Sequence, residues 1–389
     1  MMRLPAFLLA ALVLASGCGL KQRLDGPDHP ADGHAWVRPA LRNDASALAP
    51  AGLRQRIILI GDTGDPGDVE PSLEELATWG DVAADRTTVL FLGDNLYMSG
   101  LEDDDRPRGE AILRRQLEAT RAQKIFVPGN HDWGGFDPTR ANVLRNQEEF
   151  IEREGAGHAI FRPSGGCPGP VAVELSAGDA TGQGAVVAVL LDTQWWWVPA
   201  DKRVDCPGRN TAAEIVAALA SVLEEHADDL VVVASHHPFA SGSAHGGMSR
   251  GALGDAFETV VLGLGFYLQD IHEPQYQEMI GQLSPVLAAN KPLVYAAGHD
   301  HALQVLDGAG IAELQVVSGA GSEAKVSPVT HLDETIFAHA HTGFVVIDIL
   351  GPPAAPRAVL RVIEAGRYNP VFEHAIPISP GPASGSPAP

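Results

Sequence analysis

The sequence is poor in cysteine, in positive charge and in long apolar runs. Three cysteines among 389 residues are too few for a disulfide-built scaffold. Lysine and arginine number 27 against 49 acidic residues, so the formal charge of −22 argues against a basic surface for nucleic acid or an anionic membrane. The hydrophobic fraction of 45% is nevertheless high enough to bury a large core, which excludes a disordered acidic protein.

The apolar run at the amino terminus is too short to span a membrane. It extends from Leu4 to Ala15, whereas a transmembrane helix needs about 20 residues. With Arg3 before it, the run predicts a signal peptide over residues 1–17. The small residues that lead to Cys18 resemble a bacterial lipobox, in which Cys18 would carry a lipid anchor. The alternative is an ordinary cleaved signal peptide, and both predict an exported protein, either secreted or held at the cell envelope.

Composition divides the remaining chain into a tether, one domain and a tail. Residues 18–53 are rich in Pro, Ala, Gly and Asp without a sustained period, which predicts a flexible tether. Residues 379–389 repeat Gly, Pro, Ser and Ala, which predicts a disordered tail. Residues 54–378 then form a single domain, although length alone favours two or three.

Two cysteines remain after the signal peptide. Cys167 and Cys206 lie beside Pro and Gly residues, which places them in loops. Because disulfides persist outside the cytoplasm, the pair predicts one structural bridge. Two unpaired thiols are the alternative.

Short apolar runs recur along the domain, and most end at a cluster of Gly, Asp, Asn or His. Six of these runs are Ile57–Ile60, Thr88–Leu92, Lys124–Val127, Ala185–Leu191, Leu230–Ala234 and Leu293–Ala297. Polar residues at the ends of buried strands commonly form the site of a layered α/β fold, because the sheet fixes the loops and leaves their tips open.

Helical patterns fill the intervals between these strands. They cover Ser72–Ala84, Gly109–Ala122, Thr139–Arg153, Thr211–Ala227 and Pro274–Ala289. After His301 the pattern changes to strands, at Leu314–Ser318, Gly343–Leu350 and Ala358–Ala365. This order predicts an α/β fold in which two sheets lie face to face, with helices outside and the site at one edge.

Six residues at the strand ends are oxygen or nitrogen donors suited to divalent or trivalent metals. They are Asp62, Asp94, Asn130, His236, His299 and His301. Each alone has an ordinary explanation, as a turn residue, a loop cap or a buried histidine. Their occurrence at successive strand ends favours a metal centre, yet six donors are few for two six-coordinate ions.

The motifs resemble those of the calcineurin-like metallophosphoesterases, which run Asp-x-His, Gly-Asp, Gly-Asn-His, His and Gly-His-x-His. Here the first motif is Asp62-Thr63-Gly64 without the histidine, and Tyr97 stands three residues after Asp94. This combination is similar to the purple acid phosphatase branch, and residues 54–370 are similar to its small, single-domain, tartrate-resistant members. The resemblance implies a four-layer αββα sandwich of two mixed β-sheets flanked by helices.

The resemblance also implies a binuclear centre with seven ligands. Asp62, Tyr97 and His301 would bind Fe(III), Asp94 would bridge both ions, and Asn130, His236 and His299 would bind a second, divalent metal. Iron, zinc and manganese all suit that second position. His236 is chosen over His237 because the family places its ligand two residues before a proline, here Pro238.

The implied reaction is hydrolysis of small phosphate monoesters, as in acid phosphatases, by attack of a metal-bound hydroxide. His131 and His245 would be catalytic, stabilising the transition state and protonating the leaving group. A solvated loop residue is the alternative for His245. The alternatives for the whole protein are a phosphodiesterase or nucleotide-directed phosphohydrolase with the same centre, and a non-catalytic surface lipoprotein.

Three segments fall outside this scheme. Residues 246–275 are longer than the corresponding interval in the small family members and predict either a lid or a surface elaboration. Trp195–Trp197 are interpreted as core or loop packing, with a role at the rim of the site as the alternative. His339 and His341 are interpreted as loop or packing residues.

Overall fold

The computed structural model describes residues 36–37 and 48–378, except 68, 136, 138, 247–268 and 368. The predicted signal peptide, Cys18, most of the predicted tether and the predicted tail lie outside the described residues. Most of the 246–275 segment does so too. Within the described ranges, no helix is long and apolar enough to cross a membrane.

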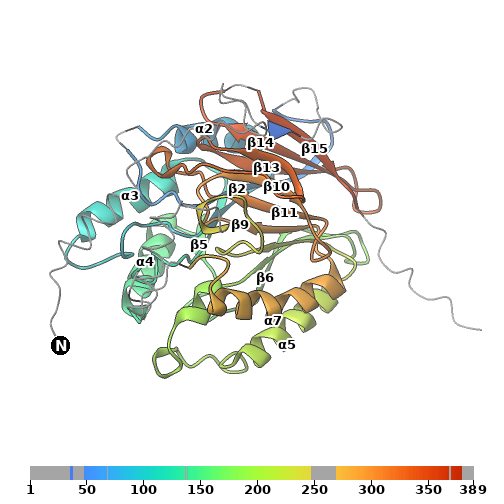
Figure 1. The fold of residues 1–389 in the computed structure, drawn as a ribbon. Coiled ribbons are helices and arrows are strands. Elements are labelled where there is room, and N and C mark those ends of the chain that lie inside the picture. The colour runs from blue at the N-terminus through green and yellow to red at the C-terminus, as the bar shows by residue number, and fades with distance from the viewer. Residues whose placement is uncertain are drawn as a thin grey trace, which may run out of the picture.

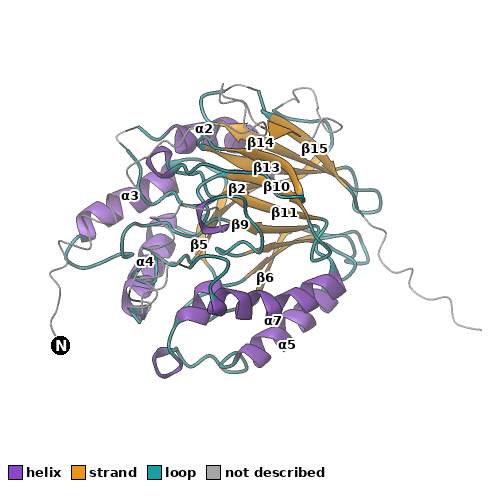
Figure 2. Ribbon diagram, viewed as in Figure 1, coloured by secondary structure: helices purple, strands orange, loops and turns teal. Residues whose placement is uncertain are grey.

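Two mixed β-sheets lie face to face, and helices cover their outer faces (Figure 1 and Figure 2). In the described chain, one sheet runs in the order β15 (Phe372–Ile376), β14 (Arg357–Glu364), β13 (Gly343–Leu350), β2 (Leu53–Ile60), β3 (Thr87–Leu92), β4 (Gln123–Val127) and β5 (Ala159–Phe161). The other runs in the order β1 (Trp36–Val37), β12 (Thr335–His339), β10 (Leu303–Asp307), β11 (Leu314–Ser318), β9 (Val294–Ala297), β8 (Leu230–Ala234), β7 (Val186–Leu190) and β6 (Val171–Ser176). The predicted four-layer αββα sandwich is confirmed.

Strand β2 shows how one strand contributes to two cores. Ile57 and Leu59 pack between the two sheets, whereas Ile58 and Ile60 pack under the helices of the outer layer. Side chains of a strand alternate between its faces, so a continuous apolar run is required where both faces are covered. All four side chains are fully buried, and each contributes roughly 1.5–3 kcal/mol through its burial.

The helices bury apolar stripes against the sheets. Helices α2 (Pro71–Gly80), α3 (Arg106–Glu118) and α4 (Ala141–Gly155) cover the sheet of β2, and α5 (Ala212–Glu225) and α7 (Pro274–Asn290) cover the sheet of β8 (Figure 1). In α5 the buried positions are Ile215, Leu219 and Leu223, one every four residues. This spacing is typical of an amphipathic helix on a sheet.

Some element boundaries differ from those predicted. The helix predicted over Ser72–Ala84 ends at Gly80. Residues 81–86 form the short 3₁₀ helix η2 (Asp81–Arg86), which is kinked at Ala83, where the dihedral angles are non-helical. Helix α3 begins three residues before the predicted Gly109, because a proline in its first turn favours a helix start there. The short strands β1, β5, β6, β10, β12 and β15 were not predicted, and β1 falls within the segment interpreted as a tether.

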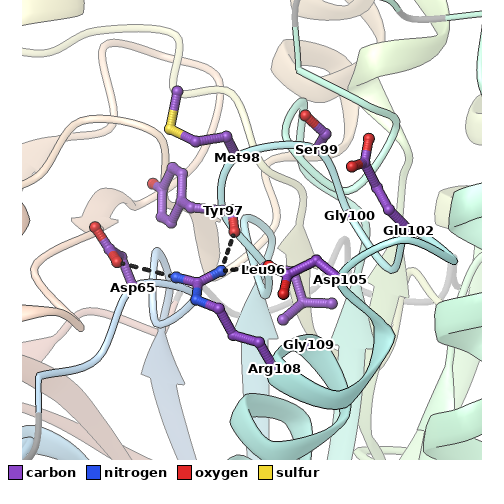
Figure 3. Close-up of a pocket in the computed structure, with 10 residues that line it drawn as sticks. All are labelled: Asp65, Leu96, Tyr97, Met98, Ser99, Gly100, Glu102, Asp105, Arg108 and Gly109. Carbon is purple, nitrogen blue, oxygen red and sulfur yellow. Dashed lines mark hydrogen bonds and ion pairs between the residues drawn. The ribbon is translucent and has the colours of Figure 1, made fainter.

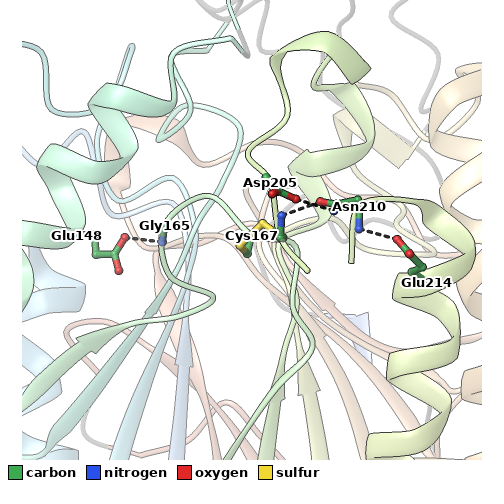
Figure 4. Close-up of a disulfide and its surroundings, with 7 residues drawn as sticks. Glu148, Gly165, Cys167, Asp205, Asn210 and Glu214 are labelled. Carbon is green, nitrogen blue, oxygen red and sulfur yellow. Dashed lines mark hydrogen bonds between the residues drawn. A yellow bond between two sulfur atoms is a disulfide. The ribbon is translucent and has the colours of Figure 1, made fainter. Parts of the chain in front are cut away.

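The predicted disulfide between Cys167 and Cys206 is confirmed, with a Cα–Cα distance of 5.7 Å. The Cys206 N–H donates to Asn210 Oδ1 at 2.6 Å, just before α5 (Figure 4). On the other side, the Gly165 N–H donates to Glu148 Oε2 of α4 at 2.7 Å. The disulfide therefore links two loops. One contacts α4, which covers the sheet of β2, and the other leads into α5, which covers the sheet of β8.

The predicted packing role of Trp195–Trp197 is also confirmed. These residues form η3 (Thr193–Trp197), and their exposed fractions are only 1%, 4% and 4%. They belong to the core under α5 and α7, and Trp196 Nε1 donates to Gln282 Oε1 of α7 at 2.8 Å. They do not form an exposed rim.

Candidate metal centre

The loops that carry the predicted ligands follow strands of both sheets and meet at one edge of the sandwich. Strands β2, β3 and β4 are parallel neighbours, and so are β7, β8 and β9, so their carboxyl ends share an edge. Backbone hydrogen bonds tie the loops together. The Asp62 N–H donates to Gly93 O at 2.9 Å, and the Gly298 N–H donates to His236 O at 3.0 Å.

Three of the predicted ligands have a left-handed backbone conformation. The φ angles of Asp62, Asp94 and His299 are 61°, 51° and 67°. This conformation costs a residue with a Cβ about 1–2 kcal/mol, and such strain clusters at functional sites. The fold therefore holds these three side chains in directions that an unstrained backbone would not give.

One group of donors consists of Asp62, Tyr97 and His301. The Tyr97 hydroxyl lies 2.9 Å from Asp62 Oδ1 and 3.1 Å from His301 Nε2. The distance between His301 Nε2 and Asp62 Oδ1 is 3.4 Å. A carboxylate, a phenol and an imidazole thus converge on one point.

A second group consists of Asn130, His236 and His299. Asn130 Oδ1 lies 2.9 Å from His236 Nε2 and 3.2 Å from His299 Nδ1, and the two nitrogens are 3.2 Å apart. The far nitrogen of each ring faces a backbone carbonyl, because His236 Nδ1 lies 2.8 Å from the oxygen of Leu92 and His299 Nε2 lies 2.9 Å from that of Gln269. A carbonyl only accepts, so each far nitrogen carries the proton. The converging nitrogens then present lone pairs to one another and to the amide oxygen, an arrangement that a cation satisfies.

Asp94 contacts both groups. Its Oδ1 lies 3.4 Å from His236 Nε2 and accepts the His131 N–H at 2.9 Å, and its carboxylate also acts on the phenol of Tyr97. One oxygen of Asp62, one of Asp94 and one nitrogen of His236 lie within 4.8 Å of one another. Asp94 therefore lies between the two groups of donors.

The charges at this edge fit a pair of cations. Asp62 and Asp94 are 0% and 2% exposed, and in the described part of the chain neither forms an ion pair with arginine or lysine. Buried carboxylates without such a partner are costly unless a cation neutralises them. Burial opposes protonation of His236, but the carboxylates of Asp94 and Asp62 outweigh burial and raise its pKa above the ordinary value.

The phenol of Tyr97 responds to the same carboxylates. Burial, followed by the charges of Asp62 and Asp94, raises the pKa of Tyr97 well above its ordinary value. Without a cation Tyr97 therefore stays neutral, and its ionisation requires a strong positive charge at the convergence point.

The structure brings both predicted catalytic histidines to this edge. His131 packs against the Tyr97 ring at a centroid distance of 4.4 Å, and its Nδ1 lies 2.7 Å from Met98 O. Burial lowers the pKa of His131, although 18% of its side chain remains exposed. The ring of His245 lies 4.3 Å from that of His299, and its Nδ1 is 2.7 Å from Asp270 Oδ1.

His237 lies among the ligands but is engaged elsewhere. Its Nδ1 is 2.8 Å from Thr193 Oγ1, its Nε2 is 2.8 Å from Gln269 Oε1, and its ring stacks on Trp197 at 4.6 Å. Burial, with the nearby charge of His236, lowers the pKa of His237 well below the ordinary value. Both ring nitrogens of His237 already bond to protein groups, whereas Nε2 of His236 faces Asn130 and His299, so His236 remains the predicted ligand.

Three residues near the centre were missed by the sequence analysis. Asp270 faces His245, Gln269 holds His299 and His237, and Lys325 Nζ lies 4.4 Å from the centroid of the Tyr97 ring. The first two fall in the 246–275 segment, which was recognised only as an unusual length. Lys325 lies well beyond the Gly-His-x-His motif that ends at His301, and its spacing gave no signal.

A cavity of about 310 Å³ lies beside Tyr97 and is lined by residues of the loop after β3 and the start of α3 (Figure 3). Arg108 crosses it, donating to the backbone oxygen of Tyr97 at 3.0 Å and lying 3.5 Å from Asp65. Glu102 and Asp105 add two further carboxylates to its lining. These carboxylates are already paired with cations, Glu102 with Arg140 and Asp65 with Arg108 and Lys325. Of the seven predicted ligands the lining includes Tyr97 alone, so the histidine side is the better candidate for substrate binding.

Comparison with known proteins identifies the family. The chain matches the model of the calcineurin-like phosphoesterases over residues 55–303, which contain all seven predicted ligands. A solved structure described as "GAP50 the anchor in the inner membrane complex of Plasmodium" has a TM-score of 0.54 and 16% identity, and the match covers 84% of this chain and 90% of that one. At this identity the likeness concerns the fold alone, and no curated protein matches. The chain belongs to the calcineurin-like phosphoesterase family, metal-dependent hydrolases of phosphoric esters with a dinuclear metal centre.

Proposed function

We propose that the protein is a phosphomonoesterase of the purple acid phosphatase type. In this proposal Asp62, Tyr97 and His301 hold Fe(III), and Asn130, His236 and His299 hold a divalent iron, zinc or manganese ion. Asp94 bridges the two positions. The observation that carries the proposal is the Tyr97 hydroxyl, 2.9 Å from Asp62 Oδ1 and 3.1 Å from His301 Nε2.

The choice of a ferric ion depends on the state of Tyr97. Its pKa is raised well above the ordinary value by burial and by two carboxylates, so it is a poor ligand for a weakly polarising ion. A trivalent cation offsets those two negative charges and favours the phenolate. The other three donors form a set of two imidazoles and an amide oxygen, which suits a divalent ion.

When bound, the two ions polarise the phosphoryl group and activate water for attack. The chain supplies the groups around that reaction. The carbonyl of Met98 holds the Nδ1–H of His131, and Nε2 faces the centre, 3.9 Å from Asp94 Oδ2. An anionic phosphoryl group bound there would favour a second proton on Nε2, which would then donate to a phosphoryl oxygen. The carboxylate of Asp270 faces Nδ1 of His245 at 2.7 Å and stabilises its imidazolium form, which protonates the leaving oxygen.

We also propose that the protein is exported and acts on small phosphoesters, with a lipid anchor at Cys18 as its membrane contact. The disulfide between Cys167 and Cys206 supports an oxidising compartment. The formal charge of −22 supports small substrates over nucleic acids, because a strongly acidic body repels polyanions.

The test combines metal analysis of the purified protein with rates on an aryl phosphate monoester, the corresponding diester and nucleotides. We expect one iron and one further metal in the centre, with the monoester hydrolysed fastest. Faster diester or nucleotide hydrolysis would assign the alternative phosphohydrolase activity. A metal-replete protein that hydrolyses none of them would favour the non-catalytic role.

A pair of aspartate variants completes the test. Asp94→Asn preserves the size of the side chain but removes the charge of the proposed bridging ligand, so we expect activity to fall by more than about a hundredfold. Asp104→Asn removes the same charge from an exposed position and should leave activity unchanged. Equal activity in the two variants would contradict the proposed centre.

A further inference from the structure

A second group of metal-type donors lies outside the dinuclear centre, where the two sheets are joined. His339 is the last residue of β12, His341 lies in the turn from β12 to β13, and Glu364 is the last residue of β14. One ligand atom from each of the three lies within 4.8 Å of the other two. None of these residues belongs to the ligand set described above.

The side chains already face one another. His339 Nε2 lies 2.9 Å from Glu364 Oε2, and the rings of His339 and His341 stack at a centroid distance of 4.4 Å with an interplanar angle of 28°. The two rings therefore lie on the same side, although His341 is already in the turn. Two imidazoles and one carboxylate form a common zinc set, with metal–ligand distances of about 2.0–2.2 Å and a fourth position for water.

A neighbouring arginine orients the carboxylate of Glu364, and the exposed side chain of His341 gives an ion access from solvent. Arg367 Nε donates to Glu364 Oε1 at 2.8 Å, which turns Oε2 toward His339, and such an outer contact commonly orients a ligating carboxylate. His339 is 4% exposed, whereas His341 is exposed to solvent. Burial lowers the pKa of His339 to about 4, so its imidazole is neutral at physiological pH, as a metal ligand must be.

We propose that His339, His341 and Glu364 bind one divalent transition-metal ion of the zinc class, separate from the dinuclear centre. The ion takes the place of the proton on Nε2 of the neutral His339 ring, and that proton moves to Nδ1 by a change of tautomer, so the ring stays neutral. Because β12 and β14 belong to different sheets, the ion ties the two sheets together at the turn between β12 and β13.

The test counts zinc bound to the full chain. Metal-depleted wild-type protein and two variants, His341→Ala and His158→Ala, are dialysed against the same Zn²⁺ solution, and bound zinc per chain is measured. We expect His341→Ala to bind one zinc fewer than the wild type. His158→Ala removes an exposed histidine elsewhere and should bind the wild-type number. Equal zinc in His341→Ala and the wild type would overturn the proposal.

A second variant keeps the zinc count decisive if His341→Ala does not fold. Glu364→Gln retains the shape of the carboxyl group and should lose the same single equivalent. If either variant fails to fold, the other decides the outcome. Failure of the proposed dinuclear centre would lower the zinc count of every protein equally, so the difference of one equivalent tests the second site alone.

Discussion

The hydroxyl of Tyr97 lies 2.9 Å from Asp62 Oδ1, although the two residues are 35 positions apart in the sequence. Asp62 follows β2 and Tyr97 lies in the loop after β3, and these strands are parallel neighbours. The contact is therefore a consequence of the sheet, which places the ends of adjacent parallel strands at one edge. It creates a carboxylate–phenol pair suited to a hard, highly charged cation.

Gly129 is expected to be essential for the position of Asp94. A Cβ at residue 129 would lie 2.3 Å from both the backbone nitrogen and Oδ1 of Asp94, so Gly129→Ala must displace the proposed bridging ligand. We expect metal affinity and phosphoesterase activity to fall by at least about tenfold to a hundredfold. Metal titration and steady-state kinetics measure both effects.

The matched control is Gly281→Ala in α7. A Cβ at this position meets nothing within 4 Å, and alanine is favoured over glycine in a helix by roughly 0.5–1 kcal/mol. This variant should gain stability and retain its metals. Loss of metal in both variants, or in neither, would show that the contact with Asp94 is not the cause.

His245 is expected to act on the leaving group. Replacement by alanine should lower kcat by about a hundredfold to ten-thousandfold for alkyl phosphates, whose leaving oxygen needs a proton. The loss should be much smaller for 4-nitrophenyl phosphate, whose leaving group is already acidic. Asp270→Asn should show the same difference between the two substrates, but a smaller one. Asp270 acts only through His245, whose ring it orients and whose protonated form it stabilises. An equal loss for both substrate types would assign His245 to binding instead.

The stability of the metal-depleted protein should fall in mild acid because of His339. Its pKa is lowered to about 4 by burial, despite the hydrogen bond to Glu364, and nearby His341 and Arg367 add to the lowering. The unfolded chain takes up the proton below about pH 6.5 and the folded chain only near pH 4. The free energy of unfolding should therefore decrease by up to about 3 kcal/mol as the pH falls through this window.

Denaturant unfolding at several pH values measures this effect. His339→Gln should show a shallower dependence between about pH 6.5 and 4. Glu364 has a lowered pKa, so it also loses stabilisation in acid, but mainly below its ordinary range. An unchanged slope in His339→Gln would contradict the role assigned to this histidine.

The architecture and the proposed ligand set were predictable because both depend on local patterns. A buried parallel strand needs a continuous apolar run, as in Leu230–Ala234, and its predicted bounds match those of β8. The donor motifs directly follow such runs, so the sheet itself determines where they meet. The short strands were missed because β5 has only three residues and β6 is incompletely buried, which weakens the apolar signal.

The surroundings of the centre were not predictable in the same way. Asp270 reaches His245 through a loop whose path depends on tertiary packing, and no periodicity marks it. Lys325 meets Tyr97 only because the segment after β11 returns to the site edge. His339 and Glu364 belong to different sheets, so their contact requires the completed sandwich.

The ferric assignment is the central claim, and visible absorption of the oxidised, metal-loaded protein tests it most directly. We expect a charge-transfer band from the Tyr97 phenolate to iron, and we expect Tyr97→Phe to lose that band while keeping its fold. Metal-loaded wild-type protein without such a band, or a Tyr97→Phe variant that retains it, would contradict the assignment of Tyr97 as an iron ligand.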